Sequence, residues 1–265
     1  MHTVGLNDEL MLTMQPAAAS RITLRCNQAD LAVDQTNLVY RAAELVLARA
    51  NRTMDLSISL TKRIPTGAGL GGGSSDAAAT ILGLNRLLEL NWSVEQMAEV
   101  GQQLGSDVPF FFVAPAACVT GRGEHVRPVR VTGNRWIVLV SPGFPVPTKW
   151  AYQQLAATRA GVRPLSVAVQ SLDQRSELDW SEIVPLVEND FEEPVFAHHP
   201  VLAQIKSQLL SLGAEVALLS GSGATMFGLF REQSAAQQAA DVFGRNPGMT
   251  AYAVPAAGAP TTTVL

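Results

Sequence analysis

Polar and apolar side chains alternate along several short segments of the chain, which predicts strands with one buried face. The alternation is cleanest over residues 54–60 and rougher over residues 9–14 and 21–26. Later in the chain, short apolar runs predict further strands at residues 136–140, 216–219, 226–230 and 249–254.

Apolar residues that recur every three or four positions predict helices between these strands. The predicted helices cover residues 38–50, the stretch after residue 76, and residues 94–104, 149–157, 201–212 and 234–243. Asp34 to Thr36 supply cap candidates for the first helix, and Ser93 with Gln96 forms a capping-box pattern before the third. No internal repeat interrupts the alternation of strands and helices, so we expect an α+β fold with a soft boundary near residue 135.

The chain has 265 residues, of which 47% are hydrophobic and 16% charged, so it is long enough for one large or two modest domains. Its net charge of −4 argues against binding nucleic acid by phosphate neutralisation. The apolar runs are too short to span a membrane and no secretory leader opens the chain, so we expect a cytoplasmic protein. Neither Cys26 and Cys118 nor the four histidines have metal-ligand spacing, and the acidic run 190–193 predicts a solvated face.

The most unusual segment is residues 62–76, in which five of the seven residues from Gly67 to Gly73 are glycine. A strand, a glycine-rich loop and a helix in this order are typical of a phosphate site, because glycine lets successive N–H groups converge on one anion. The helix adds unpaired N–H donors and the positive end of its dipole. Ser74 and Ser75 are placed to cap this helix, or to hydrogen-bond a phosphate oxygen or a metal-bound water.

Two common nucleotide loops do not fit these glycines. No lysine follows them, which excludes the Walker pattern. The dinucleotide pattern can be placed on Gly67 to Gly72, but no acidic residue ends a strand about 20 residues later, as that fold requires.

Residues 65–77, Pro-Thr-Gly-Ala-Gly-Leu-Gly-Gly-Gly-Ser-Ser-Asp-Ala, resemble the signature of the GHMP kinases, which include galactokinase and the homoserine, mevalonate and phosphomevalonate kinases. Within that superfamily, the Gly-Gly-Gly-Ser-Ser-Asp-Ala form is similar to the 4-diphosphocytidyl-2-C-methyl-D-erythritol kinases. The passages that resemble the same family elsewhere are residues 37–42, 105–110, 120–124, 142–152 and 220–225. They follow one another in the expected order over most of the chain.

The resemblance implies a two-domain GHMP kinase fold. Its N-terminal ATP-binding domain, similar to domain 2 of ribosomal protein S5, is expected over residues 1–135, and a ferredoxin-like C-terminal domain over residues 136–265. The implied reaction transfers the γ-phosphoryl group of ATP, accompanied by Mg²⁺, to the 2-hydroxyl of a cytidine diphosphate-linked polyol in the non-mevalonate route to isoprenoids. The expected protein is a monomer or homodimer without a dedicated metal site.

The resemblance also assigns roles to individual residues. Asp107 matches the catalytic aspartate, although an Asp before Val-Pro is also typical of a helix N-cap. The residues expected to hold ATP are Pro65, Gly67, Gly69, Leu70, Gly71, Gly72, Gly73, Ser74 and Ser75 near the phosphates, and Asn37, Leu38 and Lys62 near adenine and ribose. The residues expected to hold the acceptor are Thr148, Tyr152, Gly221, Ser222 and Gly223. A solvated strand-end role for Lys62, and ordinary helix packing for Tyr152, stay open as alternatives.

The chain departs from the family pattern at its start, where members have an Ala-Lys-x-Asn-like segment and then an Asp-Gly-Tyr-His-like turn. The family lysine bridges the transferred phosphate and the acceptor, and none of the three lysines here, Lys62, Lys149 and Lys206, matches it. Loss of a charged contact to the transition state commonly costs orders of magnitude in rate, so we expect weak or absent turnover from these 265 residues. Equal rates from a version extended upstream would contradict this expectation.

Two other functions stay open at this point. A GHMP kinase acting on a small alcohol such as homoserine or mevalonate would have the same loop, and acceptor-dependent ADP release distinguishes these substrates. A truncated nucleotide-binding protein with little activity would lack the family lysine. An Asp107→Asn change that keeps nucleotide binding but removes turnover would exclude that second function.

Overall fold

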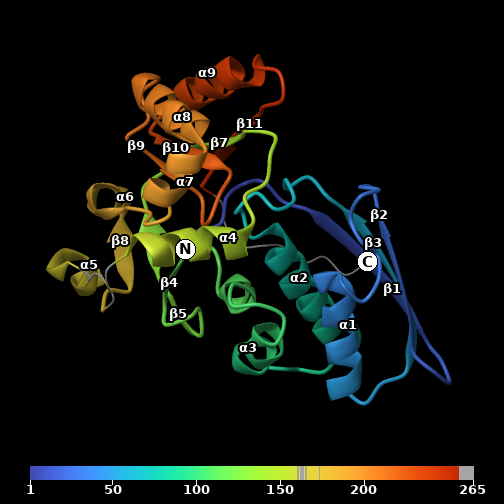
Figure 1. Ribbon diagram of the computed structural model, residues 1–265. Helices are drawn as coiled ribbons and strands as arrows, with labels where there is room; N and C mark the ends of the chain where they lie inside the picture. The colour runs from blue at the N-terminus through green and yellow to red at the C-terminus, as the bar shows by residue number, and fades with distance from the viewer. Residues whose placement is uncertain (160, 162–163, 165, 173, 257–265) are drawn as a thin grey trace. The chain divides into compact units, whose positions relative to one another are not determined.

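The computed structural model describes residues 1–159, 161, 164, 166–172 and 174–256, and these form two compact units (Figure 1). The first unit contains residues 1–64 and 71–128, and the second contains residues 65–70 and 129–256. The glycine-rich loop is therefore divided, because its first half packs with the second unit and its second half with the first.

The first unit is built on a three-stranded sheet in the order β1, β3, β2. Its strands are β1 (Glu9–Pro16), β2 (Arg21–Cys26) and β3 (Met54–Thr61). The central strand β3 is antiparallel to β1 and parallel to β2. Alternate residues of β3 are buried from Leu56 to Leu60, which confirms the predicted half-buried strand.

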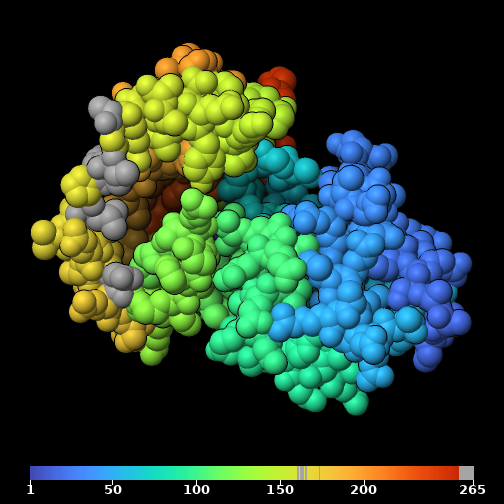
Figure 2. Space-filling view, turned by 60° about the horizontal axis from the view of Figure 1, so that its bottom comes forward, coloured from blue at the N-terminus to red at the C-terminus, as the bar shows by residue number. Residues whose placement is uncertain are grey.

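Helices cover one face of this sheet, with α1 and α2 side by side (Figure 1). The remaining elements of the first unit are α1 (Leu38–Arg49), α2 (Gly72–Leu87), α3 (Val94–Gln102), the 3-10 helix η1 (Val108–Phe112), β4 (Ala117–Thr120) and β5 (His125–Pro128). The apolar stripe of α2 is buried in the core of the unit, including Ala77, Ile81 and Leu84. Figure 2 shows α1, in light blue, and the green segment around α3 on one face, where Arg49 pairs with Glu99 at 2.6 Å.

Helix α1 begins where it was expected, but its cap differs from the predicted one. The side chain of Asn37 accepts a hydrogen bond from the N–H of Val39, so Asn37 is the N-cap. Asp34 instead accepts bonds from the N–H and hydroxyl of Thr36 in the preceding turn. The prediction of a cap within Asp34 to Thr36 was wrong, because the local turn already uses that carboxylate. The capping box of Ser93 and Gln96 is confirmed.

The second unit is built on an antiparallel four-stranded sheet in the order β11, β7, β10, β9. Its strands are β7 (Trp136–Ser141), β9 (Val216–Leu219), β10 (Met226–Phe230) and β11 (Thr250–Pro255). Helices α8 (Pro200–Ser211) and α9 (Gln233–Gly244) pack on this sheet and bury a shared apolar core. The order of strands and helices is that of a ferredoxin-like domain, as expected.

A smaller group of elements flanks the sheet, and all but the first of them lie between β7 and α8 in the chain (Figure 1). These elements are β6 (Arg130–Thr132), α4 (Thr148–Thr158), α5 (Val167–Leu172), β8 (Glu177–Asp179), α6 (Trp180–Ile183), the 3-10 helix η2 (Val184–Leu186) and α7 (Glu192–His198). Strands β6 and β8 pair in parallel. The sequence predicted only α4 among these elements, whereas the overall α+β class is confirmed.

Candidate active site

The second half of the glycine loop leads into the start of α2. Gly71 has a φ of +68° and occupies the N-cap position of α2, where no side chain caps the helix. The helix therefore begins with backbone N–H groups that side chains leave available to an anion. Two serines, Ser74 and Ser75, follow in the first turn of α2. The hydroxyl of Ser75 donates to the carbonyl of Gly72 at 2.8 Å, whereas that of Ser74 does not make this bond to the backbone.

The first half of the loop packs against the turn between β9 and β10. The hydroxyl of Ser220 donates to the carbonyl of Gly69 at 2.9 Å, and the N–H of Thr225 donates to the carbonyl of Ala68 at 3.2 Å. Gly69 has a φ of +75°, and a Cβ atom placed on it would overlap the carbonyl oxygen of Ser220. Only glycine satisfies both the backbone angle and this close approach. The structure thus brings Gly69 together with the predicted substrate segment 221–223.

Asp107 lies in the turn before η1, in the first unit. It occupies the N-cap position of η1 but makes no side-chain capping bond, and its side chain is exposed. The capping role left open by the sequence is therefore not formed. Directly after it, Val108, Pro109 and Phe110 are buried, which anchors the turn to the core. An exposed carboxylate on an anchored turn is well placed to meet a ligand.

Close contacts hold this turn beside the start of α2. A Cβ atom placed on Gly105 would lie 4.0 Å from the hydroxyl oxygen of Ser74, and one placed on Gly71 would lie 3.4 Å from the ring of Phe111. A Cβ atom on Gly123 would lie 2.6 Å from the carbonyl oxygen of Ser106. The Asp107 turn is thus packed between the helix start and the β4–β5 turn.

The predicted adenine residues lie on the same unit. Asn37 uses its side chain to cap α1 and to donate to the carbonyl of Ala32 at 2.7 Å. Leu38 lies beside the helix start, since a Cβ atom placed on Gly73 would be 3.5 Å from its Cδ1 atom. The structure therefore groups Leu38, Gly73 and Ser74 around one end of α2.

Lys62 is buried, with only 6% of its surface exposed, so the solvated alternative is wrong. Its ammonium group donates to the carboxylates of Asp8 and Asp76, the latter at 2.9 Å. Burial lowers the pKa of Lys62, but the charges of Asp76 and Asp8 outweigh it and hold that pKa above the usual value. Burial raises the pKa of Asp76 to about 7, against the opposing effect of Lys62. Sequence reasoning missed both carboxylate partners.

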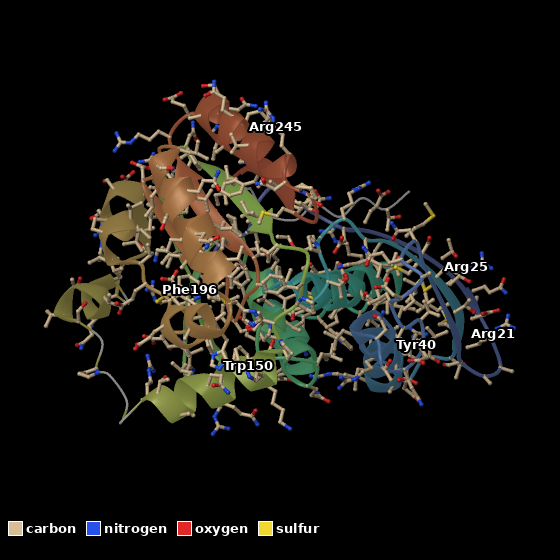
Figure 3. All side chains as sticks on the ribbon, turned by 45° about the horizontal axis from the view of Figure 1, so that its top comes forward. Arg21, Arg25, Tyr40, Trp150, Phe196 and Arg245 are labelled. Carbon is tan, nitrogen blue, oxygen red and sulfur yellow. The ribbon has the colours of Figure 1, made fainter. Side chains whose placement is uncertain are left out.

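The predicted acceptor residues lie in the second unit. Thr148 is the first residue of α4, and the hydroxyl of Ser222 donates to its hydroxyl at 3.1 Å. Tyr152, one turn later, is 60% exposed, and its ring meets the ring of Phe191 edge-on with centroids 4.9 Å apart. The ring thus has both a packing contact and a large exposed surface, and its place in the acceptor pocket stays a prediction. Figure 3 labels Trp150 on the same helix and Phe196 on α7.

Two supports of the segment 220–223 were missed by the sequence reading. The side-chain amide of Asn189 donates to the carbonyls of Leu219 and Gly221, both at 2.8 Å. Glu192 pairs with Lys206 at 2.5 Å and accepts from the N–H of Leu219 at 2.9 Å. The acidic run is therefore not simply a solvated face, because Glu192 braces the end of β9.

Within the described ranges, no three His, Cys, Asp or Glu side chains gather in a way that could hold a metal ion. No helix in the same part of the chain is both long and apolar enough to cross a membrane.

Comparisons with known proteins match both halves of the chain. The family model of the GHMP kinase N-terminal domain matches residues 37–114, and that of the C-terminal domain matches residues 169–248. A 4-diphosphocytidyl-2-C-methyl-D-erythritol kinase from Citrifermentans bemidjiense is 37% identical over 96% of this chain and 88% of its own length. The kinase of the same name from Syntrophotalea carbinolica is 39% identical, with the same coverage.

Solved structures agree with these matches. A crystal structure of a 4-(cytidine 5'-diphospho)-2C-methyl-D-erythritol kinase is 32% identical, with a TM-score of 0.73, and the match covers 92% of this chain and 84% of that one. A homoserine kinase from Cytophaga hutchinsonii has a TM-score of 0.75 at 21% identity over 95% and 86% of the two chains, which shows the shared fold alone. The chain belongs to the GHMP kinases and, within them, to the family of the 4-diphosphocytidyl-2-C-methyl-D-erythritol kinases.

Proposed function

We propose that the chain transfers the γ-phosphoryl group of ATP to the 2-hydroxyl of 4-diphosphocytidyl-2-C-methyl-D-erythritol, a step toward isoprenoids. The observation that carries the proposal is the exposed, uncapped carboxylate of Asp107 on a turn packed beside the uncapped start of α2. Residues 1–135 would form the ATP-binding domain and residues 136–265 the C-terminal domain. Family membership supports both assignments.

The glycine loop would hold the phosphates of ATP through backbone amides. The left-handed angles of Gly67, Gly69 and Gly71 turn the chain so that its N–H groups can face one anion, and the start of α2 adds further donors. Phosphoryl transfer asks mainly for alignment and charge stabilisation, and such a loop supplies both without a basic patch. This explains how a chain with net charge −4 could bind a polyanion.

Asp107 would accept or steer the proton of the attacking 2-hydroxyl. An exposed carboxylate is a base that can take this proton as the phosphorus–oxygen bond forms. Because its turn is anchored by buried neighbours, the carboxylate would need little rearrangement to reach the acceptor.

Mg²⁺ would accompany the phosphates and neutralise part of their charge. Mg²⁺ is commonly bound through substrate phosphates and few protein carboxylates, so the ion would be held mainly by the nucleotide. The hydroxyl of Ser74, which is not committed to the helix backbone as that of Ser75 is, could contact a metal-bound water.

Acceptor-dependent ADP release tests the proposed substrate. We expect release with the cytidyl acceptor and none above background with homoserine or mevalonate. Release with homoserine or mevalonate, and none with the cytidyl acceptor, would contradict the proposal.

Replacing Tyr152 by Ala should raise the KM for the cytidyl acceptor about tenfold, because stacking on an aromatic ring contributes roughly 1–3 kcal/mol per base. The KM for ATP should stay within about twofold, since no phosphate contact is removed. Tyr152→Phe is the matched control, because it keeps the ring that meets Phe191. Steady-state kinetics with each substrate varied in turn measure the two KM values. An unchanged KM for the acceptor in Tyr152→Ala would show that Tyr152 does not contact the acceptor.

A further inference from the structure

Three charged side chains gather in the interior of the first unit, and we call them the Lys62 cluster: Asp8, Lys62 and Asp76. The side chains are only 2%, 4% and 5% exposed, respectively. They come from the residue before β1, the residue after β3 and the fifth residue of α2. Burying three charges costs free energy, so the cluster is unlike the surface ion pairs of the same sheet.

Hydrogen bonds fix Lys62 at both its backbone and its ammonium group. The side-chain oxygen of Asn27 accepts from the N–H of Lys62 at 2.7 Å, and its amide donates to the carbonyl of Lys62 at 3.2 Å. Asp8 also accepts from the N–H groups of Arg63 at 2.5 Å and Ile64 at 2.9 Å. The position of the chain directly before the glycine loop is therefore closely determined.

The cluster joins the two ends of the glycine loop. Lys62 lies three residues before Pro65, and Asp76 directly follows Ser75. A Cβ atom placed on Gly72 would lie 3.2 Å from the Nζ atom of Lys62 and 3.0 Å from Ile64. The start of α2 is thus packed against the Lys62 cluster, and a side chain larger than that of Gly72 would push the two apart.

A buried ion pair often adds little net stability compared with apolar packing, so the directional contacts need another explanation. The bonds from Lys62 to Asp8 and Asp76 link the residue after β3 to the residue before β1 and to the first turns of α2. Asp8 is fixed by two backbone N–H groups as well as by Lys62. Burial raises the pKa of Asp76 to about 7, against the opposing effect of Lys62.

We propose that Asp8, Lys62 and Asp76 are positioning residues that fix the start of α2 and thereby the amides that meet the nucleotide phosphates. The inference rests on the proposed function of this loop. The ammonium of Lys62 acts through the helix and not as a phosphate ligand, since both carboxylates already occupy it. The bond between Lys62 and Asp76 ties the end of β3 to α2, and the bond between Lys62 and Asp8 fixes the ammonium group of Lys62.

The test compares Asp76→Ala, which removes the acceptor for Lys62, with Asp76→Asn, which keeps one. Binding of MgADP is measured by titration calorimetry, which needs no phosphate acceptor. We expect Asp76→Ala to weaken MgADP binding about tenfold and Asp76→Asn, at pH 6, to stay within about twofold of wild type. The matched control is Asp55→Asn at the other end of β3, where Asp55 pairs with Arg21 at the surface and MgADP binding should not change.

These outcomes separate the inference from its competitors. If Lys62 were a phosphate ligand held back by the carboxylates, Asp76→Ala would free it and strengthen MgADP binding, which would overturn the inference. Equal affinities of wild type and Asp76→Ala would also overturn it, while leaving the proposed function intact. Absence of MgADP binding by the wild-type protein would overturn the proposed function, and the inference with it.

A second pair of variants decides the matter if Asp76→Ala does not fold. Asp8→Ala removes the other acceptor for Lys62 without changing α2, and Asp8→Asn keeps one. We expect Asp8→Ala to bind MgADP several-fold more weakly than Asp8→Asn. Equal affinities of these two variants would overturn the inference.

Discussion

Replacing Asp107 by Asn should lower kcat by a factor of about 10²–10⁴ while leaving MgADP binding within about twofold of wild type. Asn has the size of Asp but cannot take the proton of the attacking hydroxyl, and general-base catalysis typically contributes a factor in that range. Since the side chain of Asp107 is exposed and makes no capping bond, its loss should not destabilise the fold. Stopped assays of ADP and of phosphorylated acceptor measure kcat, titration calorimetry measures MgADP binding, and thermal unfolding measures stability.

Asp30→Asn is a suitable control, because Asp30 is an exposed aspartate elsewhere in the first unit. It should leave kcat unchanged. A kcat of Asp107→Asn above about a third of the wild-type value would show that Asp107 does not act as the base. Loss of MgADP binding in the same variant would instead point to a structural role for the turn.

The second large effect is expected from Gly69→Ala, which should raise the KM for ATP about a hundredfold. The new methyl group would overlap the carbonyl oxygen of Ser220 and lie 2.8 Å from that of Gly223. Both neighbours are backbone atoms, so the loop itself must move, and misplacement by about 1 Å can cost a factor near 10². The left-handed φ of +75° adds roughly 1–2 kcal/mol of strain.

Gly213→Ala separates steric overlap from backbone strain. Gly213 also has a left-handed φ, of +97°, but a Cβ atom there would meet nothing within 4 Å. This control should lower the free energy of unfolding by a similar 1–2 kcal/mol or so and leave the KM for ATP unchanged. If both variants had the same KM for ATP, the packing of Gly69 against Ser220 would not matter to nucleotide binding.

Local patterns predicted most of the framework. The alternation of β3, the apolar stripe of α2 and the capping box before α3 are properties of neighbouring residues, and all three are confirmed. The short elements between α4 and α8 were not predicted, because periodicity over three to seven residues is weak. One signal was present: Asp179 and Glu182 form a capping box around the start of α6.

The supports of the candidate site depend on residues that are far apart in the sequence. Asp8 and Lys62 are 54 positions apart, and Asn189 and Gly221 are 32 apart, so no local pattern pairs them. The solvated alternative for Lys62 and the prediction of a simply solvated face around Glu192 were therefore wrong. The residues assigned to ATP and to the acceptor came from the resemblance, and their roles stay predictions.

Phosphorus NMR of the reaction products tests the central claim most directly. The protein is incubated with MgATP and the cytidyl acceptor, and the same incubation is made with Asp107→Asn. The account predicts one new phosphate monoester for each ADP formed, with its phosphorus coupled to carbon 2 of the acceptor. Over the same time Asp107→Asn should form neither ADP nor the monoester above background. ADP formed with inorganic phosphate instead of a monoester, or equal monoester from both proteins, would contradict it.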